Sequence, residues 1–365
     1  MLRATFVYIP VVFMSIQYLY YLFFILLGKT KPNTKNTTRE SGISILVYVK
    51  NKENVLHEFI TSLLEQTYEH KEIVLVNHCS TDNSLSIMEA FSEKYKTIKI
   101  VNVANNETFW NNKKYALTLG VKAATYDCIL FTESTVIPAT KEWIATVANS
   151  FATTKTILIG NEKIITTKNS LLGILSKFTN ILTTAQMISF VNIGIPYKAF
   201  KGNFAMHKED FFRVNGFISH LKINNGEFDL FLQDAANSRN TTMSPVPKNT
   251  VYRNSTISLK KYLSLQKEDI KIIKEYKKLP KTFLRLFRFS KIIVYLTLPL
   301  LFFLNLKYSL GFLLVYYLLQ YAALFSLIKV FKEKKLLIFL PILDCLYAMV
   351  CLYTFMSTLA SSVKN

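Results

Sequence analysis

Residues 43–83 read ISILVYVKNKENVLHEFITSLLEQTYEHKEIVLVNHCSTDN, and this stretch decides the fold class. It opens with a continuous β-branched run at 43–49, and a second apolar run lies at 72–76. Between them, the apolar residues of 54–66 recur at helical spacing. Runs that are apolar throughout suit strands buried on both faces, which is typical of a parallel sheet. The stretch therefore predicts a strand–helix–strand unit.

The same alternation continues along the chain to residue 131. We predict a helix over 85–95, a strand over 98–103, a helix over 113–123 and a strand over 127–131. In parallel α/β sheets, ligands bind at the carboxyl ends of the strands. The polar segments that follow the strands are therefore the places to look for chemistry, and they are 50–54, 77–84 and 132–135.

Several classes of site are disfavoured by the sequence. No Gly-x-Gly-x-x-Gly follows a strand and no Gly-Lys-Ser/Thr phosphate loop exists, so a dinucleotide enzyme and a P-loop NTPase are both disfavoured. Four cysteines in 365 residues are not a disulfide framework, and none has Cys-x-x-Cys spacing. We therefore expect a reducing compartment for the middle of the chain and no zinc site.

Apolar residues gather at both ends of the chain. Residues 5–27 carry no charge and are long enough to cross a bilayer as a helix. A cleaved signal peptide is the competing interpretation, but it needs a shorter apolar core and a small-residue cleavage site. Three more apolar runs close the chain, at 292–306, 309–328 and 336–357.

Basic residues orient these spans. One cluster follows the first span and another separates the third span from the fourth, and both belong on the cytoplasmic side. Four crossings then place both termini outside and residues 29–290 in the cytoplasm. Asp344 lies inside the last run, where a carboxylate is a functional candidate by default. Because the sequence shows no basic partner, we interpret it as a single carboxyl near a helix–helix contact.

The segment KKLPKTFLRLFRFSK at 277–291 alternates aromatic and aliphatic with basic residues at near-helical spacing. It predicts a helix in the lipid headgroup layer, with a solvated linker as the alternative. The predicted domains are a transmembrane helix at 1–28, a linker at 29–40, an α/β domain at 41–275, the basic interfacial helix at 276–291, three transmembrane helices at 292–358 and a tail at 359–365.

Seven segments follow one another in a recognisable order. They are Lys50-Asn51-Lys52-Glu53, the loop Val74–Asp82, the helix start Phe109–Leu117, Phe131–Thr135, Lys201–Met206, Gly226–Leu230, and Tyr262 with Gln266 and Lys267. After one membrane helix and before three more, this order resembles the inverting, membrane-attached family-2 glycosyltransferases over residues 41–270. The resemblance implies a GT-A-like (Rossmann-like) α/β fold, with a mostly parallel sheet flanked by helices, plus N-terminal and C-terminal transmembrane helices.

The resemblance also implies roles for individual residues. A leaving diphosphate needs a divalent cation held by carboxylate oxygens, and a second carboxylate must deprotonate the acceptor hydroxyl. The implied site residues are Glu227 and Asp229 for catalysis; Lys50, Asn51, Glu53, His78, Asp82 and Lys114 for the donor; Glu133 and Thr135 for the metal; Gly202 and Asn203 for the acceptor; and Gln266 and Lys267 for the diphosphate.

The sequence departs from the family pattern at four of these places. His78 and Thr135 stand where the family has aspartate, and Glu227 has a longer arm than the usual base. Glu268 and Asp269 stand where cations are expected, and they would repel a diphosphate. A neutral hydroxyl in place of an anionic oxygen weakens metal binding, so we expect a weakened Mg²⁺ or Mn²⁺ site.

Two interpretations remain open. In the first, the chain is a bacterial inner-membrane glycosyltransferase for envelope polysaccharide, which moves a sugar from a nucleotide-sugar donor to a lipid-linked or glycan acceptor by metal-assisted inverting displacement. In the second, it is a catalytically degenerate glycosyltransferase-like membrane protein that acts as a binding or partner subunit. The net charge of 44 − 24 = +20 comes without an RNA-binding motif, so acidic lipid and an anionic donor explain it better than nucleic acid.

Overall fold

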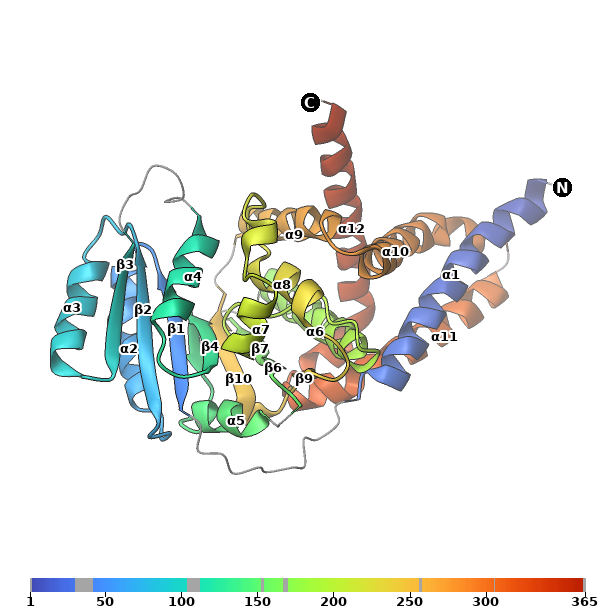
Figure 1. The fold of residues 1–365 in the computed structure, drawn as a ribbon. Helices are drawn as coiled ribbons and strands as arrows, with labels where there is room; N and C mark the ends of the chain where they lie inside the picture. Colours follow the sequence, from blue (N-terminus) through green and yellow to red (C-terminus); the bar gives the residue numbers. More distant parts are fainter. Residues whose placement is uncertain are drawn as a thin grey trace. The chain divides into compact units, whose positions relative to one another are not determined.

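The computed structural model describes residues 2–29, 42–103, 112–151, 154–166, 170–255, 258–304 and 306–363. The chain divides into two compact units. The α/β unit comprises residues 30–165 and 193–254, and the helical unit comprises residues 1–29, 166–192 and 255–365. Figure 1 labels most of the helices and strands of both.

The α/β unit is built on a seven-stranded sheet with the order β3-β2-β1-β4-β8-β6-β9. Its strands are β1 (Ile43–Val49), β2 (Lys71–His78), β3 (Ile98–Val103), β4 (Cys128–Glu133), β6 (Ile157–Ile159), β8 (Phe204–His207) and β9 (Thr241–Met243). The first four strands pair in parallel, as do β6 and β9, and β8 is antiparallel to both of its neighbours. The predicted α/β fold with a mostly parallel sheet is confirmed.

Helices cover both faces of this sheet. The helices of the unit are α2 (Glu53–Leu64), α3 (Ser84–Lys94), α4 (Lys113–Ala123), α5 (Trp143–Ser150), α7 (Lys208–Arg213) and α8 (Glu227–Ala235), with short 3₁₀ turns at Ile218–His220 and Pro247–Asn249. The core on one face joins side chains of α2, α3 and α5 to alternate residues of β1 and β2. On the other face α4 lies so close that a Cβ at Gly120 would come within 2.7 Å of Leu46 and Val76.

A second, three-stranded sheet lies beside the end of β4. It has the order β5-β10-β7, with β5 (Val136–Pro138), β10 (Thr250–Asn254) and β7 (Asn161–Ile165). In the ladder, Arg253 pairs with Val136 on one side and with Ile164 on the other. Because Val136 is only three residues beyond Glu133, this register brings Arg253 next to the end of β4.

The helical unit contains six helices among the described residues (Figure 1). They are α1 (Leu2–Leu27), α6 (Leu171–Asn192), α9 (Leu259–Lys274), α10 (Lys278–Leu304), α11 (Leu306–Val330) and α12 (Lys335–Val363). Four of them, α1, α10, α11 and α12, are long and apolar enough to span a membrane. Helices α1 and α10 pack with opposite directions, since Tyr20 contacts Phe283 while Met14 packs with Leu301.

The structure differs from the prediction at 276–306. We expected a basic interfacial helix followed by a short span, but α10 is one helix of 27 residues. The basic residues of α10 interrupt the run of apolar residues in the sequence, but two of them point into the interior of the helical unit. Arg288 forms an ion pair with Asp269 of α9, and Lys291 is fully buried. Helices α6 and α9 also belong to the helical unit, although the predicted α/β domain at 41–275 included them.

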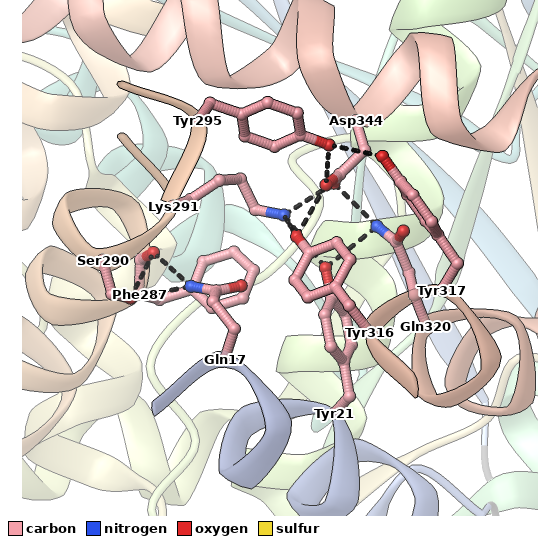
Figure 2. A network of polar contacts seen from close by, with 10 residues as sticks. All are labelled: Gln17, Tyr21, Phe287, Ser290, Lys291, Tyr295, Tyr316, Tyr317, Gln320 and Asp344. Atoms are coloured by element: carbon pink, nitrogen blue, oxygen red, sulfur yellow. Dashed lines mark hydrogen bonds and ion pairs between the residues drawn. The ribbon is translucent and has the colours of Figure 1, made fainter. Parts of the chain in front are cut away.

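Lys291 corrects the interpretation of Asp344. The two side chains, both 0% exposed, form an ion pair with 2.6 Å between Nζ and Oδ1. Hydroxyls of Tyr21 and Tyr316 lie 2.9 and 2.8 Å from the Lys291 ammonium (Figure 2). The Asp344 carboxylate also accepts hydrogen bonds from Tyr295, Tyr316 and Gln320. The aspartate of the predicted last span therefore has a basic partner, which spacing along the sequence does not reveal.

Candidate functional site

The loops after β1 and β2 are bound to each other by three of the predicted donor residues. Asn51, at a left-handed φ of 52°, accepts a hydrogen bond of 2.8 Å from the Thr81 amide. Glu53 accepts one from the Asn83 amide, and the Glu53 amide in turn donates to Asp82. Asp82 also accepts from the Ser84 amide at the start of α3. The carboxylates thus fix the two loops at the carboxyl edge of the sheet.

His78 ends β2 at the same edge. Its side chain is buried, and Nδ1 lies 2.7 Å from the hydroxyl of Tyr48. The Lys113 ammonium lies over the Tyr48 ring, 5.0 Å from its centre. Burial raises the pKa of the Tyr48 hydroxyl to about 12, although Lys113 opposes that shift. Lys50, just after β1, is half-buried. A line of polar and aromatic groups therefore leads from the donor loops to the start of α4.

Lys113 joins the two key carboxylates of the sequence prediction. Its Nζ lies 3.4 Å from Glu133 Oε1, at the end of β4, and 2.9 Å from Glu227 Oε1, at the start of α8. Lys201 adds a second ammonium 3.6 Å from Glu227 Oε2. Asn112 caps α4 by accepting from the Lys114 amide, which places Lys113 at the first helical position. Glu133 and Glu227 therefore face one another across a shared cation.

The cations keep both carboxyls ionised. Burial raises the pKa of Glu227, but Lys113 and Lys201 outweigh it and hold that pKa at about 2. Burial likewise raises the pKa of Glu133, and Lys113 and Arg253 lower it to about 2. The same two carboxylates raise the pKa of Lys113 against the effect of its own burial. All of these groups are charged near neutral pH.

Arg253 of β10 completes the arrangement. Its guanidinium binds both oxygens of Glu162, with 2.5 Å from Nε to Oε1 and 2.8 Å from Nη2 to Oε2. Nη2 also donates to Glu133 Oε2 at 3.0 Å, and Nη1 donates to the Thr135 hydroxyl at 2.8 Å. We call the six residues of this arrangement the Arg253 cluster: Lys113, Glu133, Glu162, Lys201, Glu227 and Arg253.

Comparison with known proteins identifies the family of the segment that carries four of the six cluster residues, Lys113, Glu133, Glu162 and Lys201. Residues 44–218 match the family described as "Glycosyl transferase family 2". These residues are a family-2 glycosyltransferase domain. The chain is 39% identical over 75 residues to an "Uncharacterized glycosyltransferase" of Haemophilus influenzae, and this covers 20% of the chain and 23% of that relative. It is 30% identical over 128 residues to a "Poly-beta-1,6-N-acetyl-D-glucosamine synthase" of Staphylococcus epidermidis, covering 33% and 29%. The matches thus span less than a third of either relative.

The fold of the glycosyltransferase domain has a solved counterpart. A mannosyltransferase from Pyrobaculum calidifontis, in complex with GDP-Man and Mn²⁺, superposes with a TM-score of 0.59 at 15% identity. The superposition covers 96% of this chain and 99% of the other. At this identity the likeness shows the fold, and the predicted GT-A-like architecture is confirmed.

The Mn²⁺ of that structure raises the question whether the glycosyltransferase domain offers a metal site. Here Glu133 is bonded to Arg253 and Lys113, and the Thr135 hydroxyl accepts from Arg253. Across the described ranges, no group of three or more His, Cys, Asp and Glu side chains is arranged to hold a metal ion. The donor set at Glu133 and Thr135 therefore does not fit a divalent cation, because protein cations already occupy its oxygens.

The other predicted acceptor and catalytic positions hold the domain together. Asn203 is buried, and its amide donates to the carbonyls of Asn161 and Asn249. A Cβ at Gly202 would come within 2.7 Å of Val136, so only glycine fits there without displacement. Asp229 accepts from the Ala199 amide at 3.2 Å. These contacts tie the segment 199–203 to α8 and to the second sheet.

The remaining predicted residues lie apart from the cluster's ion pairs. Lys114 is buried, and its Nζ donates to the carbonyls of His220 and Ile223 at 2.7 and 2.5 Å. Gln266 and Lys267 belong to α9 of the helical unit, where Lys267 donates to the hydroxyl of Tyr353. The predicted motif portion 109–111 lies outside the described residues.

Sequence reasoning missed the cationic half of the site. Arg253 and Glu162 lie on short strands of the second sheet and belong to no motif that we recognised. Lys113 and Lys201 stand within quoted motifs, but no role was assigned to them. The available signal was an arginine within TVYRN at 250–254, an otherwise uncharged strand that follows the helix carrying the predicted base.

Proposed function

We propose that the chain is a membrane-bound glycosyltransferase that moves a sugar from a nucleotide-sugar donor to a lipid-linked or cell-envelope glycan acceptor. The observation that carries the proposal is that Glu133 and Glu227 meet at Lys113, at the carboxyl edge of the sheet, with Glu133 and Lys113 inside the segment that matches family 2. Four helices long enough to span a membrane support the attachment, and the basic clusters at their ends favour a cytoplasmic domain.

In the proposed reaction, Glu227 is the general base. It takes the proton of the acceptor hydroxyl, whose oxygen forms the new bond to the anomeric carbon. The bond from that carbon to the diphosphate breaks, and the nucleoside diphosphate leaves with the electron pair. One displacement from the opposite side inverts the configuration. Lys113 and Lys201 stabilise the charge that develops on the diphosphate.

The ion pairs of Glu227 with Lys113 and Lys201 set the order of steps in this mechanism, with donor binding before proton abstraction. In the free protein, Lys113 and Lys201 hold the pKa of Glu227 at about 2, against its burial, which makes it a weak base. A bound diphosphate competes for the same two ammonium groups. As their hold on Glu227 weakens, burial raises its pKa towards the range of an effective base. We therefore propose that donor binding activates the base.

A cavity in the helical unit supports a lipid-linked acceptor. It has a volume of about 570 Å³ and lies among α9, α10 and α12. Apolar side chains such as Leu286, Phe289 and Phe355 line it, together with three basic residues, Lys274, Arg285 and Arg288, the last of which is paired with Asp269. An apolar wall with basic side chains suits a hydrocarbon chain that ends in a phosphate.

A second candidate function is a non-catalytic binding subunit. The burial of Glu227 favours it, because the side chain is 1% exposed and lies against Lys113 and Lys201. An acceptor hydroxyl reaches this carboxylate only if those lysines shift. Under this alternative, the domain binds a nucleotide sugar or a protein partner without turnover.

The two functions are separated by Glu227→Gln in the full chain, reconstituted in lipid. As a glycosyltransferase, the wild type transfers radiolabelled sugar from UDP-GlcNAc or GDP-Man, and the variant loses turnover by at least 100-fold while its donor affinity stays equal or rises. Glu142→Gln, an exposed position of the same domain, is the matched control and keeps turnover. Donor binding without turnover in the wild type would support the binding subunit instead.

A further inference from the structure

We infer that Arg253, together with Lys113 and Lys201, replaces the divalent cation of the donor site, so that the diphosphate of a nucleotide sugar is bound by side-chain cations without a metal ion. The inference rests on the proposed function, because it concerns how the proposed donor is held. It starts from the mismatch between the donor set at Glu133 and a metal ion.

Arg253 is hydrogen-bonded to the oxygens that would bind a metal ion. Its hydrogen bonds reach Glu133, Glu162 and the Thr135 hydroxyl, which stands at the second position of the predicted metal motif. These four bonds use four of the five N–H donors of the guanidinium. Within the described ranges, no acceptor is recorded for the fifth, on Nη1. Arg253 is thus fixed by the protein and retains one donor for a ligand oxygen.

The burial gradient of the Arg253 cluster favours an anion over a cation. The exposed fractions of the side chains rise from the carboxylates to the cations, in the order Glu227 1%, Glu162 8%, Glu133 21%, Lys113 24%, Arg253 26% and Lys201 38%. The most exposed side chain of the cluster is therefore an ammonium group, Lys201, and the most buried is a carboxylate, Glu227. A guanidinium and two ammonium groups are the usual protein partners of phosphate oxygens.

A metal ion would also have to break these ion pairs. Moving Arg253 aside leaves Glu162 buried without its bidentate partner, and breaking a buried pair is strongly unfavourable. With three carboxylates and three cations, the cluster is electrically balanced before any ligand binds. An added divalent ion would give it a net charge of +2 next to three fixed cations. A diphosphate needs no such rearrangement of Arg253.

The test uses the full chain in lipid nanodiscs, with UDP, UDP-GlcNAc, GDP and GDP-Man as probes and calorimetry as the readout. We expect dissociation constants in EDTA and in 5 mM Mn²⁺ that agree within threefold. A second readout is Mn²⁺ electron paramagnetic resonance without nucleotide, where we expect no stoichiometric bound ion. Binding that needs Mn²⁺, or a bound ion that Glu133→Gln abolishes, would overturn the inference and leave the proposed function standing.

The two ways of holding the donor, by Arg253 or by a metal ion, predict different effects of Glu133→Gln on the affinity for a nucleoside diphosphate. If Arg253 holds the diphosphate, Glu133→Gln frees one of its N–H donors, and affinity for the nucleoside diphosphate stays equal or rises. If a metal holds it, the same change lowers affinity by at least tenfold, which would contradict the inference. Arg253→Gln should weaken nucleoside diphosphate binding at least tenfold and leave the plain nucleoside unaffected, and Arg253→Lys should restore part of the loss.

The controls are Arg239→Gln and Glu142→Gln, which remove exposed charges elsewhere in the α/β unit. If no probe binds to the folded wild type under either condition, the proposed function itself fails, and the inference fails with it. Because Glu133→Gln leaves the bidentate Arg253–Glu162 pair in place, it tests the inference even where Arg253→Gln does not fold.

Discussion

The Lys291–Asp344 pair should stabilise the packing of α10 against α12 in the helical unit. At 2.6 Å, the attraction of the two charges is about 6 kcal/mol at an effective dielectric constant of about 20. Removing one partner leaves the other charge buried and unpaired, which typically costs about 3–5 kcal/mol. Asp344→Asn and Lys291→Gln should each lower the free energy of unfolding by that amount and the Tm by on the order of 10 °C.

The charge-neutral double variant Lys291→Gln/Asp344→Asn keeps two hydrogen-bonding side chains and removes both charges. It should therefore be more stable than either single variant, by about 2 kcal/mol or more. Unfolding of the full chain in mixed micelles gives the four free energies of the cycle. Thr354→Val on α12 is a matched control, because that hydroxyl bonds only to backbone of its own helix. Single variants within about 1 kcal/mol of the wild type, or strictly additive losses, would refute an ionised pair.

Three further predictions follow from the charges of the chain. First, the pKa values of Glu133 and Glu227, which burial raises and the neighbouring cations lower to about 2, lie below the ordinary value near 4.5. Their contribution to stability is therefore complete above about pH 4.5 and is lost as the pH falls towards 2; an acid-unfolding profile should be shallower for Glu227→Gln, and an unchanged profile would contradict this. Second, a reporter fused after residue 365 should lie on the outer side of the membrane, and a cytoplasmic signal would overturn the four-span topology. Third, Arg285→Gln at the cavity of the helical unit should raise the KM for a polyprenyl phosphate acceptor at least fivefold with the donor KM unchanged, and an equal change in both would remove the cavity from acceptor binding.

The first half of the α/β unit could be predicted from the sequence because its central strands β1 and β2 contain continuous apolar runs and the edge strand β3 is rich in β-branched residues. The predicted strands 43–49 and 98–103 and the predicted helix 113–123 coincide with β1, β3 and α4. Burial on both faces imposes such runs on central strands, and helical spacing then defines what lies between. The short strands β5, β7 and β10 have no comparable apolar run, because each has only three to five residues.

Residues of the candidate site could be predicted only where family motifs supplied them. Glu133 and Glu227 were predicted from such motifs, and the structure brings both to Lys113. Arg253 was not predicted, because a β-ladder register rather than a sequence spacing brings it to Glu133. The same applies to Lys291 and Asp344, which are 53 residues apart in the sequence. A hydropathy pattern treats both as breaks in apolar runs, whereas the folded bundle neutralises them against each other.

Binding of nucleotide sugars to the folded full chain tests the central claim most directly. The claim is that the Arg253 cluster, at the carboxyl edge of the seven-stranded sheet, holds an activated sugar. Titration with UDP-GlcNAc and GDP-Man in nanodiscs should reveal one saturable site, from which the matching nucleoside diphosphate displaces the donor. The absence of binding by either donor at millimolar concentration, in protein that keeps its cooperative unfolding transition, would contradict the account.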